Sequence, residues 1–139
     1  MSEKTAVPKP LPRIGARAEY TRTVTENDIV RFAEVSGDHN PVHLDEEYAA
    51  STPFRGRIAH GILSASFISA ILGNNLPGPG TIYLGQTLKF LAPVRIGDTI
   101  TASAEVIALR EDKRIVTLRT DCINQDAVLV LTGEATTKC

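Results

Sequence analysis

The sequence has few of the features that mark secreted, membrane-spanning or disulfide-rich proteins. Its 139 residues include no tryptophan, one methionine and two cysteines, and the first 15 residues contain no apolar segment of the kind a secretory signal requires. The most apolar stretch, residues 61–72, contains three serines and is too short to cross a bilayer, which takes about 20 helical residues. We therefore expect a soluble protein of the cytoplasm.

Cysteine is too scarce to build a disulfide framework or a metal site. Cys122 lies within an alternating apolar stretch and Cys139 is the last residue, with no metal-ligand spacing around either. We expect both to be free thiols. Because neither has a neighbouring histidine in the sequence, neither is expected to act as a nucleophile.

An excess of charge of one sign is also absent. The chain has 15 basic and 16 acidic side chains, which gives a formal net charge of -1. It therefore lacks the basic field that would hold a nucleic-acid backbone or an anionic membrane, and we expect neither as a partner. Arg55 and Arg57 could contact the phosphates of a substrate, but solvated surface charge is the more common role of such residues.

The hydrophobic residues are mostly aliphatic, and they suffice for one domain. Hydrophobic residues make up 42% of the chain and aromatic residues only 5%, so the core must depend on aliphatic packing. Small domains of this kind often bury further surface by dimerising, and we expect a homodimer. Prolines at positions 8, 10 and 12 predict an extended N-terminal arm over residues 1–15, ahead of a single domain over residues 16–139.

The first half of the domain alternates short elements with turns. The pattern indicates a strand over residues 18–24 and then a helix with Thr25 as its N-cap and Gly37 at its C-terminal end. Residues 38–44 contain Pro41 and are not expected to form a regular helix. A short helix should begin at Asp45, where acidic residues suit the positive end of the helix dipole.

The second half predicts a long helix and a sheet. Residues 60–73 are apolar nearly all round, so this helix must be covered on most sides. Four β-rich segments follow and suggest an antiparallel meander; they span residues 81–91, 98–109, 114–124 and 127–137. The simplest arrangement is an α+β fold in which the sheet wraps around the helix.

Residues 36–43 carry the densest set of polar side chains. At neutral pH a carboxylate accepts hydrogen bonds and an imidazole can donate or accept, so Asp38 and His43 can activate a water as a pair. The bend at Pro41 would let residues five apart converge. The alternative is that Asp38 caps local amides, Asn40 forms an Asx-Pro turn, and His43 is a buried histidine with satisfied hydrogen bonds.

The start of the apolar helix is the second candidate feature. The free amides and the dipole of a helix N-terminus favour a partial negative charge such as that on a polarised carbonyl oxygen, and Gly61 would allow a ligand to approach closely. In the simpler interpretation Gly61 only permits contact between helix and sheet, and His60 caps the helix or lies near the surface.

Other chemistries find less support in the sequence. Asp38, His39, His43 and His60 are potential ligands for zinc or iron, but Pro41 makes helical geometry between the first two histidines improbable, so we expect no metal. The serines of residues 61–72 lack the strand-turn-helix context of a nucleophile elbow. No glycine-rich phosphate loop occurs either, which argues against nucleotide-dependent chemistry.

Taken together, the motifs resemble those of the (R)-specific enoyl-CoA hydratases of the MaoC-like hot-dog family. They are Asp-His-Asn-Pro-Val-His at 38–43, Arg-Ile-Ala-His-Gly at 57–61, Tyr-Leu-Gly-Gln at 83–86 and the segment 88–98. The resemblance extends over residues 18–138 and is nearest to the short, stand-alone hydratases that feed polyhydroxyalkanoate synthesis from fatty-acid β-oxidation.

The resemblance implies a five-stranded antiparallel sheet around a long central helix, with two protomers pairing into one continuous sheet. It implies that Asp38 and His43 activate a water that adds to C3 of a trans-2-enoyl-CoA, giving (R)-3-hydroxyacyl-CoA without a metal or organic cofactor. The Gly61 amide would bind the thioester oxygen, and Asn40 would support the loop. It further assigns residues of the central helix to the acyl pocket: Ser69, Ile68 and Leu72.

Three alternatives remain on the same scaffold. An acyl-CoA thioesterase usually places its carboxylate on the central helix, and residues 61–73 contain no Asp or Glu. A dehydratase acting on an acyl-carrier protein would use the same site with a different carrier. A non-catalytic acyl-CoA-binding domain is disfavoured because Asp38 and His43 are both intact.

Overall fold

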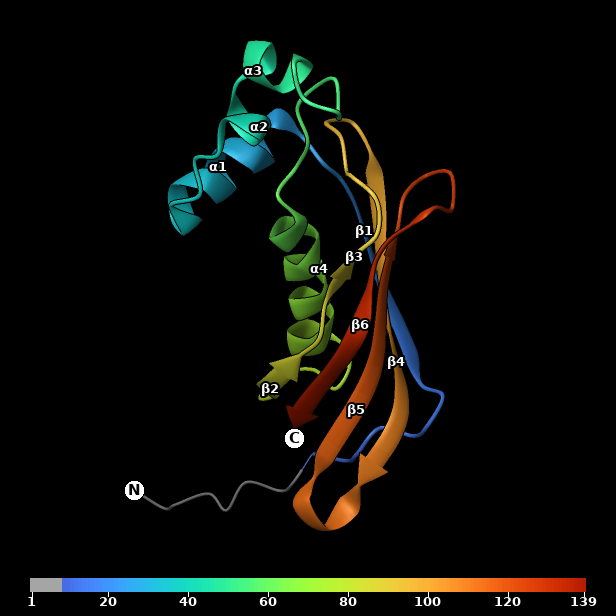
Figure 1. The fold of residues 1–139 in the computed structure, drawn as a ribbon. Helices are drawn as coiled ribbons and strands as arrows, with labels where there is room; N and C mark the ends of the chain where they lie inside the picture. Colours follow the sequence, from blue (N-terminus) through green and yellow to red (C-terminus); the bar gives the residue numbers. More distant parts are fainter. Residues whose placement is uncertain (1–8) are drawn as a thin grey trace, which may run out of the picture.

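An antiparallel sheet curves around one long helix, as Figure 1 shows for the computed structural model, which describes residues 9–139. Strand β1 (Arg17–Thr23) is followed by helices α1 (Glu26–Ser36), α2 (Pro41–Leu44), α3 (Glu46–Ala50) and α4 (Gly61–Asn74). The remaining strands are β2 (Ile82–Gln86), β3 (Lys89–Phe90), β4 (Thr99–Arg110), β5 (Ile115–Ile123) and β6 (Leu129–Lys138). The α+β fold expected from the sequence is therefore confirmed.

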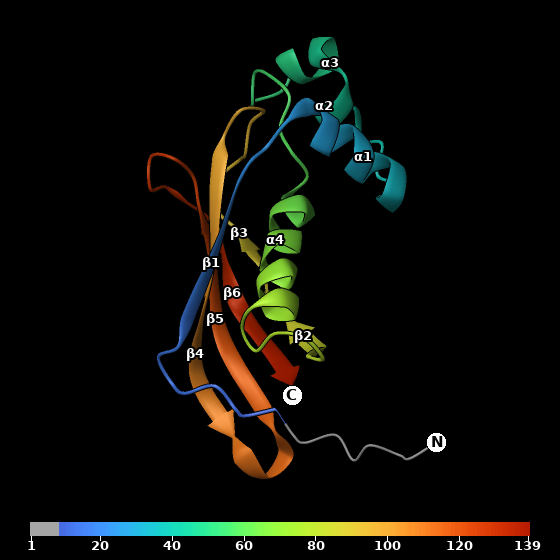
Figure 2. The same cartoon turned by 180° about the vertical axis from the view of Figure 1, so that it is seen from behind.

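The strand order corrects one part of the expected meander. Strands β4, β5 and β6 do follow one another in the sheet, but β2 and β3 lie beside β6 rather than beside β4. The reason is that β1 occupies the other edge of β4, in a register that runs from Arg17 opposite Glu105 to Thr23 opposite Thr99. Figure 2, from behind, shows β1 along that edge.

The strand expected over residues 81–91 is broken into β2 and β3, which follow one another along β6. The break lies where Thr87 passes close to Gly133 of β6: a Cβ atom on Gly133 would lie 1.8 Å from the Thr87 carbonyl oxygen. Only glycine therefore fits at position 133. Beyond the break, Phe90 of β3 pairs with Leu131.

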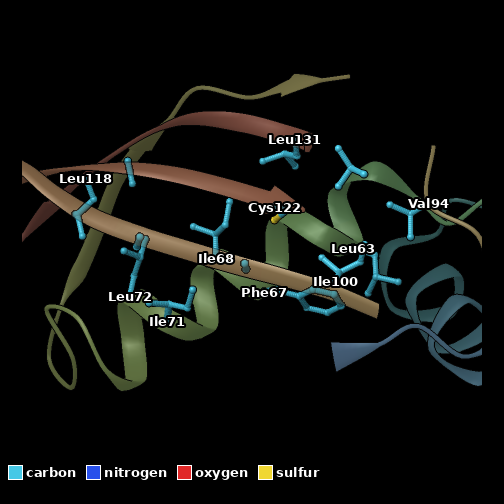
Figure 3. Close-up of a cluster of buried hydrophobic side chains, with 14 of the residues drawn as sticks. Leu63, Phe67, Ile68, Ile71, Leu72, Val94, Ile100, Leu118, Cys122 and Leu131 are labelled. Carbon is cyan, nitrogen blue, oxygen red and sulfur yellow. The ribbon is translucent and has the colours of Figure 1, made fainter. Parts of the chain in front are cut away.

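Helix α4 packs one side against the concave face of the sheet. Its side chains Phe67, Ile68, Ile71 and Leu72 meet residues of the strands, such as Leu118, in the cluster drawn in Figure 3. Burying each of these large side chains contributes about 1.5–3 kcal/mol before entropy is counted. The sheet covers only one side of α4, so the other side of the helix is exposed in the single chain.

Helices α1, α2 and α3 lie together beyond the N-terminal end of α4 (Figures 1 and 2). Thr25 caps α1 in a reciprocal arrangement with Asp28, and Gly37 ends it with φ of 80°, as predicted. The expectation of no helix at residues 38–44 was wrong. Pro41 occupies the first helical position of α2, where its missing N–H has no partner to lose.

The segment before β1 runs along the sheet without regular structure. Lys9 donates to the carbonyl oxygen of Pro79 at 2.7 Å, Leu11 packs against the core, and the Gly15 amide donates to Val106 at 2.8 Å. Residues 1–8 of the expected arm, including Pro8, lie outside the described residues. In residues 9–139 no helix has both the length and the hydropathy that a membrane span needs.

Candidate active site

Asp38, His43 and His60 meet where α1, α2 and α4 come together. One potential ligand atom from each of the three lies within 4.8 Å of the others. A water that hydrogen-bonds two groups at once can span up to about 5.6 Å between them. The Asp38 carboxylate and the His43 imidazole therefore lie close enough to hold a single water between them.

His43 is buried on α2 and its ring is fixed by the backbone. Its Nδ1 lies 2.8 Å from the carbonyl oxygen of Ile58, an acceptor only, so Nδ1 carries the proton and donates it. The other ring nitrogen, Nε2, then has a free lone pair. His43 is thus held in the tautomer that a general base requires.

The surroundings of His43 also keep the ring neutral. Burial lowers the pKa of His43, and the charge of His60 acts in the same direction. The hydrogen bond to Ile58 and the charge of Asp38 oppose this shift, but they do not outweigh it. Because its pKa lies below the usual range, His43 is mostly unprotonated at neutral pH and can accept a proton from water.

His60 supports both members of the pair, a role that the sequence did not predict. Its ring stacks on that of His43, with centroids 3.9 Å apart and planes inclined by 29°. Its Nε2 donates to the backbone carbonyl oxygen of Asp38 at 3.0 Å. His60 is the N-cap residue of α4, but its side chain makes no capping hydrogen bond and is buried, so neither side-chain capping nor a position near the surface, as considered from the sequence, is found. The contacts of His60 with His43 and Asp38 join segments that are distant in the sequence, so no local sequence pattern could predict them.

Asp38 and Asn40 hold the loop that leads into α2. One carboxylate oxygen of Asp38 accepts the Asn40 amide at 3.2 Å, and Asn40 Oδ1 accepts the Val42 amide at 3.1 Å as the N-cap of α2. The sequence left two interpretations open, that Asp38 caps local amides and that Asp38 converges with His43. The structure shows both. Asp38 is exposed, which leaves its other carboxylate oxygen accessible to water.

The same three residues are poorly arranged to coordinate a metal ion. The rings of His43 and His60 stack with their planes inclined by 29°, whereas tetrahedral coordination requires a lone pair of each ring to point at the same ion. Each imidazole also uses one nitrogen to donate to a backbone carbonyl group. His39 is exposed and lies outside the group.

Gly61 opens α4 beside His43, and an apolar cavity of about 390 Å³ adjoins both residues. The cavity is lined by residues from five segments: His43, Phe54, Ile58, Ala59, Gly61, Ile62, Ser64, Phe90, Leu91, Ala92, Pro93, Val94, Val130 and Leu131. A Cβ atom on Gly61 would lie 2.6 Å from the Phe90 ring, so the ring rests directly on the glycine. Gly61, the first residue of α4, thus lines a space suited to an apolar ligand with a carbonyl group.

The three residues that the resemblance assigns to the acyl pocket do not line this cavity. Ile68 and Leu72 are fully buried in the core of the single chain, and Ser69 is exposed on the uncovered side of α4. None of them lines the cavity beside His43, because they lie two to three turns further along the helix. The cavity takes its apolar wall from the segment 90–94 and from β6 instead.

Comparison with known proteins places the whole arrangement in a family. The family described as "MaoC like domain" matches residues 11–126. A protein named (R)-specific enoyl-CoA hydratase from Rhodospirillum rubrum is 55% identical over 122 residues, covering 88% of this chain and 84% of that protein. A mitochondrial 3-hydroxyacyl-[acyl-carrier-protein] dehydratase of Arabidopsis thaliana is 40% identical over 131 residues, covering 92% and 78%.

A solved structure agrees with the fold described above. An (R)-hydratase from A. caviae that is described as involved in PHA biosynthesis superposes with a TM-score of 0.89 at 47% identity. The match covers 91% of this chain and 96% of the other. The fold described above is thus shared with a solved structure over nearly the whole of both chains.

Proposed function

The chain belongs to the MaoC-like domain family, and we propose that it is an (R)-specific enoyl-CoA hydratase, a carbon–oxygen lyase. It adds water across the double bond of a trans-2-enoyl-CoA to give an (R)-3-hydroxyacyl-CoA. The observation that carries the proposal is the juxtaposition of Asp38 and His43, which lie within 4.8 Å of each other, with His43 lining an apolar cavity.

In this mechanism Asp38 and His43 hold the reacting water. The neutral His43 takes a proton at Nε2 as the water oxygen forms a bond to C3, and the exposed Asp38 oxygen accepts the second hydrogen of the water and orients it. The π electrons of the double bond move to the thioester and form an enolate. A proton from the pair then reaches C2, and the balance is the addition of one water.

Gly61 stabilises the negative charge that develops on the thioester oxygen. Its amide lies in the first turn of α4, where N–H groups have no intrahelical partner and the helix dipole is positive. Removing an oxyanion donor of this kind costs about 3 kcal/mol of transition-state stabilisation. Asn40 acts indirectly, through the loop that carries Asp38.

The acyl chain occupies apolar space next to these groups. The cavity lined by Phe90 and Val130 is the candidate space that the single chain supplies. Ser69, Ile68 and Leu72 remain the residues that the family resemblance assigns to the acyl pocket. Since Ser69 faces outward, it can contact an acyl chain only in space that a second protomer encloses.

A homodimer is part of the proposal. Among residues 9–139, strand β2 is the last strand at one edge of the sheet, and several large apolar side chains are exposed on β2, β3 and the start of α4: Ile62, Ile82, Tyr83, Leu84 and Phe90. An edge strand with such side chains favours pairing with another strand. We place the contact there, with two protomers sharing one sheet, and we place the enzyme in the cytoplasm.

A dehydratase acting on an acyl-carrier protein is the second candidate. It would catalyse the same bond changes in the direction that releases water, and the 40% identity to the Arabidopsis dehydratase supports it. The catalytic atoms are the same for both, so only the carrier separates the two. A thioesterase is less supported, since α4 carries no carboxylate.

The test is the addition of purified protein to crotonyl-CoA. We expect loss of the ultraviolet absorbance of the conjugated thioester, formation of (R)-3-hydroxybutyryl-CoA on chiral analysis, and no free thiol. Release of thiol would instead show a thioesterase. Activity on crotonyl-acyl-carrier protein but not on the CoA ester would favour the dehydratase, and no change with either carrier would refute catalysis.

A further inference from the structure

Arg57 connects the helix that carries His43 to the start of α1. Its Nε donates to the backbone carbonyl oxygen of His43 at 2.8 Å, and its Nη1 forms an ion pair with Glu26 at 2.8 Å. The Arg57 side chain is only 10% exposed, whereas Glu26 is 66% exposed. The guanidinium group is therefore not the solvated surface charge considered from the sequence.

The position of His43 depends on such contacts, because α2 is a helix of four residues. A single turn is not stable alone: helix formation has a costly nucleus, and isolated helices shorter than about 12 residues are marginal in water. The segment that follows α3 supplies the missing support. The Ile58 amide donates to Val42 at 3.3 Å, and the Ile58 carbonyl oxygen accepts from the His43 ring at 2.8 Å.

Arg57 donates a hydrogen bond to a carbonyl group of α2 that has no donor within the helix. The carbonyl oxygens of the last turn of a helix have no intrahelical donor, and a cation at that end also interacts favourably with the helix dipole. The His43 carbonyl group lies in the last turn of α2, and Arg57 donates to it directly. At the same time the ion pair with Glu26 fixes the guanidinium against the first turn of α1.

We propose that Arg57 is a positioning residue for His43, holding the backbone of α2 so that the imidazole stays aligned with Asp38. The inference rests on the proposed hydratase function and deepens it. Arg57 does not line the cavity and acts only through His43. Its effect should therefore appear in turnover rather than in substrate affinity.

The main test compares Arg57→Gln with a matched control, Arg22→Gln. Arg22 also forms an ion pair with the first turn of α1, through Asp28, but its remaining hydrogen bond is to Tyr20 of β1 rather than to α2. Asp28 is 7% exposed, so the control leaves a buried carboxylate without its cation and should lose at least as much stability. We expect kcat on crotonyl-CoA to fall by about 10- to 100-fold in Arg57→Gln, as a displacement near 1 Å would cause, with KM within about three-fold. Arg22→Gln should keep the kcat of the wild type.

Two further variants separate the contacts of Arg57. Arg57→Lys keeps the charge but cannot donate to His43 and Glu26 from one rigid plane, so we expect partial recovery of kcat. Glu26→Gln removes the ion pair and keeps the donor to His43, and it should cost less than Arg57→Gln. Equal kcat in Arg57→Gln and wild type, or equal losses in Arg57→Gln and Arg22→Gln, would overturn the proposal.

A spectroscopic measurement keeps the inference independent of activity. The ¹⁵N resonances of His43 report its tautomer, and in the wild type we expect a proton fixed on Nδ1. In Arg57→Gln we expect averaging between tautomers, with no such change in Arg22→Gln. Unchanged His43 resonances in Arg57→Gln would refute the positioning role of Arg57, whether or not the wild type hydrates an enoyl-CoA. If the His43 tautomers average in Arg57→Gln but the wild type hydrates no enoyl-CoA, only the proposed function is refuted. If Arg57→Gln does not fold, Arg57→Lys and Glu26→Gln give the same comparison.

Discussion

Replacing Gly61 by alanine tests the link between the helix N-terminus and the reaction. The new Cβ atom would lie 2.6 and 2.7 Å from two atoms of the Phe90 ring, about 1 Å closer than ordinary van der Waals contact. Phe90 is 51% exposed, so its ring can move away without unfolding the core. We therefore expect the ring to shift into the cavity beside the Gly61 amide rather than the protein to lose its fold.

The magnitude follows from the role of that amide. A misplacement of 1 Å near the reacting atoms costs up to about 100-fold, and loss of an oxyanion donor costs about 100- to 1,000-fold in kcat. We expect kcat/KM on crotonyl-CoA to fall by about 100-fold in Gly61→Ala, which is about 2.7 kcal/mol. The melting temperature should change little, since alanine is the better helix former.

A matched control lies on the same helix. A Cβ atom on Gly73 would meet nothing within 4 Å, so Gly73→Ala should keep full activity. The double variant Gly61→Ala/Phe90→Leu removes the ring that the new methyl group contacts and should regain part of the lost rate. Wild-type kcat/KM in Gly61→Ala, or no recovery in the double variant, would refute the reasoning.

Further predictions concern the catalytic pair, pH and the buried thiol. Asp38→Asn and His43→Ala should each lose several orders of magnitude in kcat with far-ultraviolet circular dichroism unchanged; wild-type turnover in either would contradict the assignment. Because burial lowers the pKa of His43, the acid limb of kcat/KM should have a midpoint below the ordinary 6.5, and a midpoint above it would contradict a neutral base. The hydrogen bonds from Arg22 lower the pKa of Asp28, so its stabilising effect is full above the unfolded-state value of about 4 and is lost as pH falls through the lower folded value. Asp28→Asn should therefore lower the melting temperature at pH 7 and much less in strong acid. Desolvation raises the pKa of Cys122 to about 12, so a thiol reagent should label it only after unfolding.

Much of the fold could be predicted because the decisive signals are local. Thr25 and Gly37 mark the ends of α1 by capping chemistry that depends on neighbouring residues alone. The apolar helix and the alternating strands likewise follow from periodicity. The sequence does not predict the short helix α2, because proline breaks a helix at most positions and is favourable only at the first, which Pro41 occupies.

The remaining features depend on contacts between distant segments. The break between β2 and β3 requires Thr87 to meet Gly133, 46 positions away, and the stacking of His43 on His60 joins two separate helices. No periodicity or spacing in the sequence encodes such pairs. The sequence could indicate that Asp38 and His43 converge, because their motif is short and specific, whereas nothing in the segment around Phe90 shows that it lines the cavity.

Because of the contact between Gly133 and Thr87, the shape of the cavity beside His43 depends on a residue that does not line it. A side chain at position 133 would collide with the Thr87 carbonyl oxygen, and relief would require β3 to move away from β6. Phe90 would move with β3 and uncover Gly61. A screen for altered substrate range would therefore recover changes at position 133 together with changes in the cavity wall, although Gly133 itself does not line the cavity.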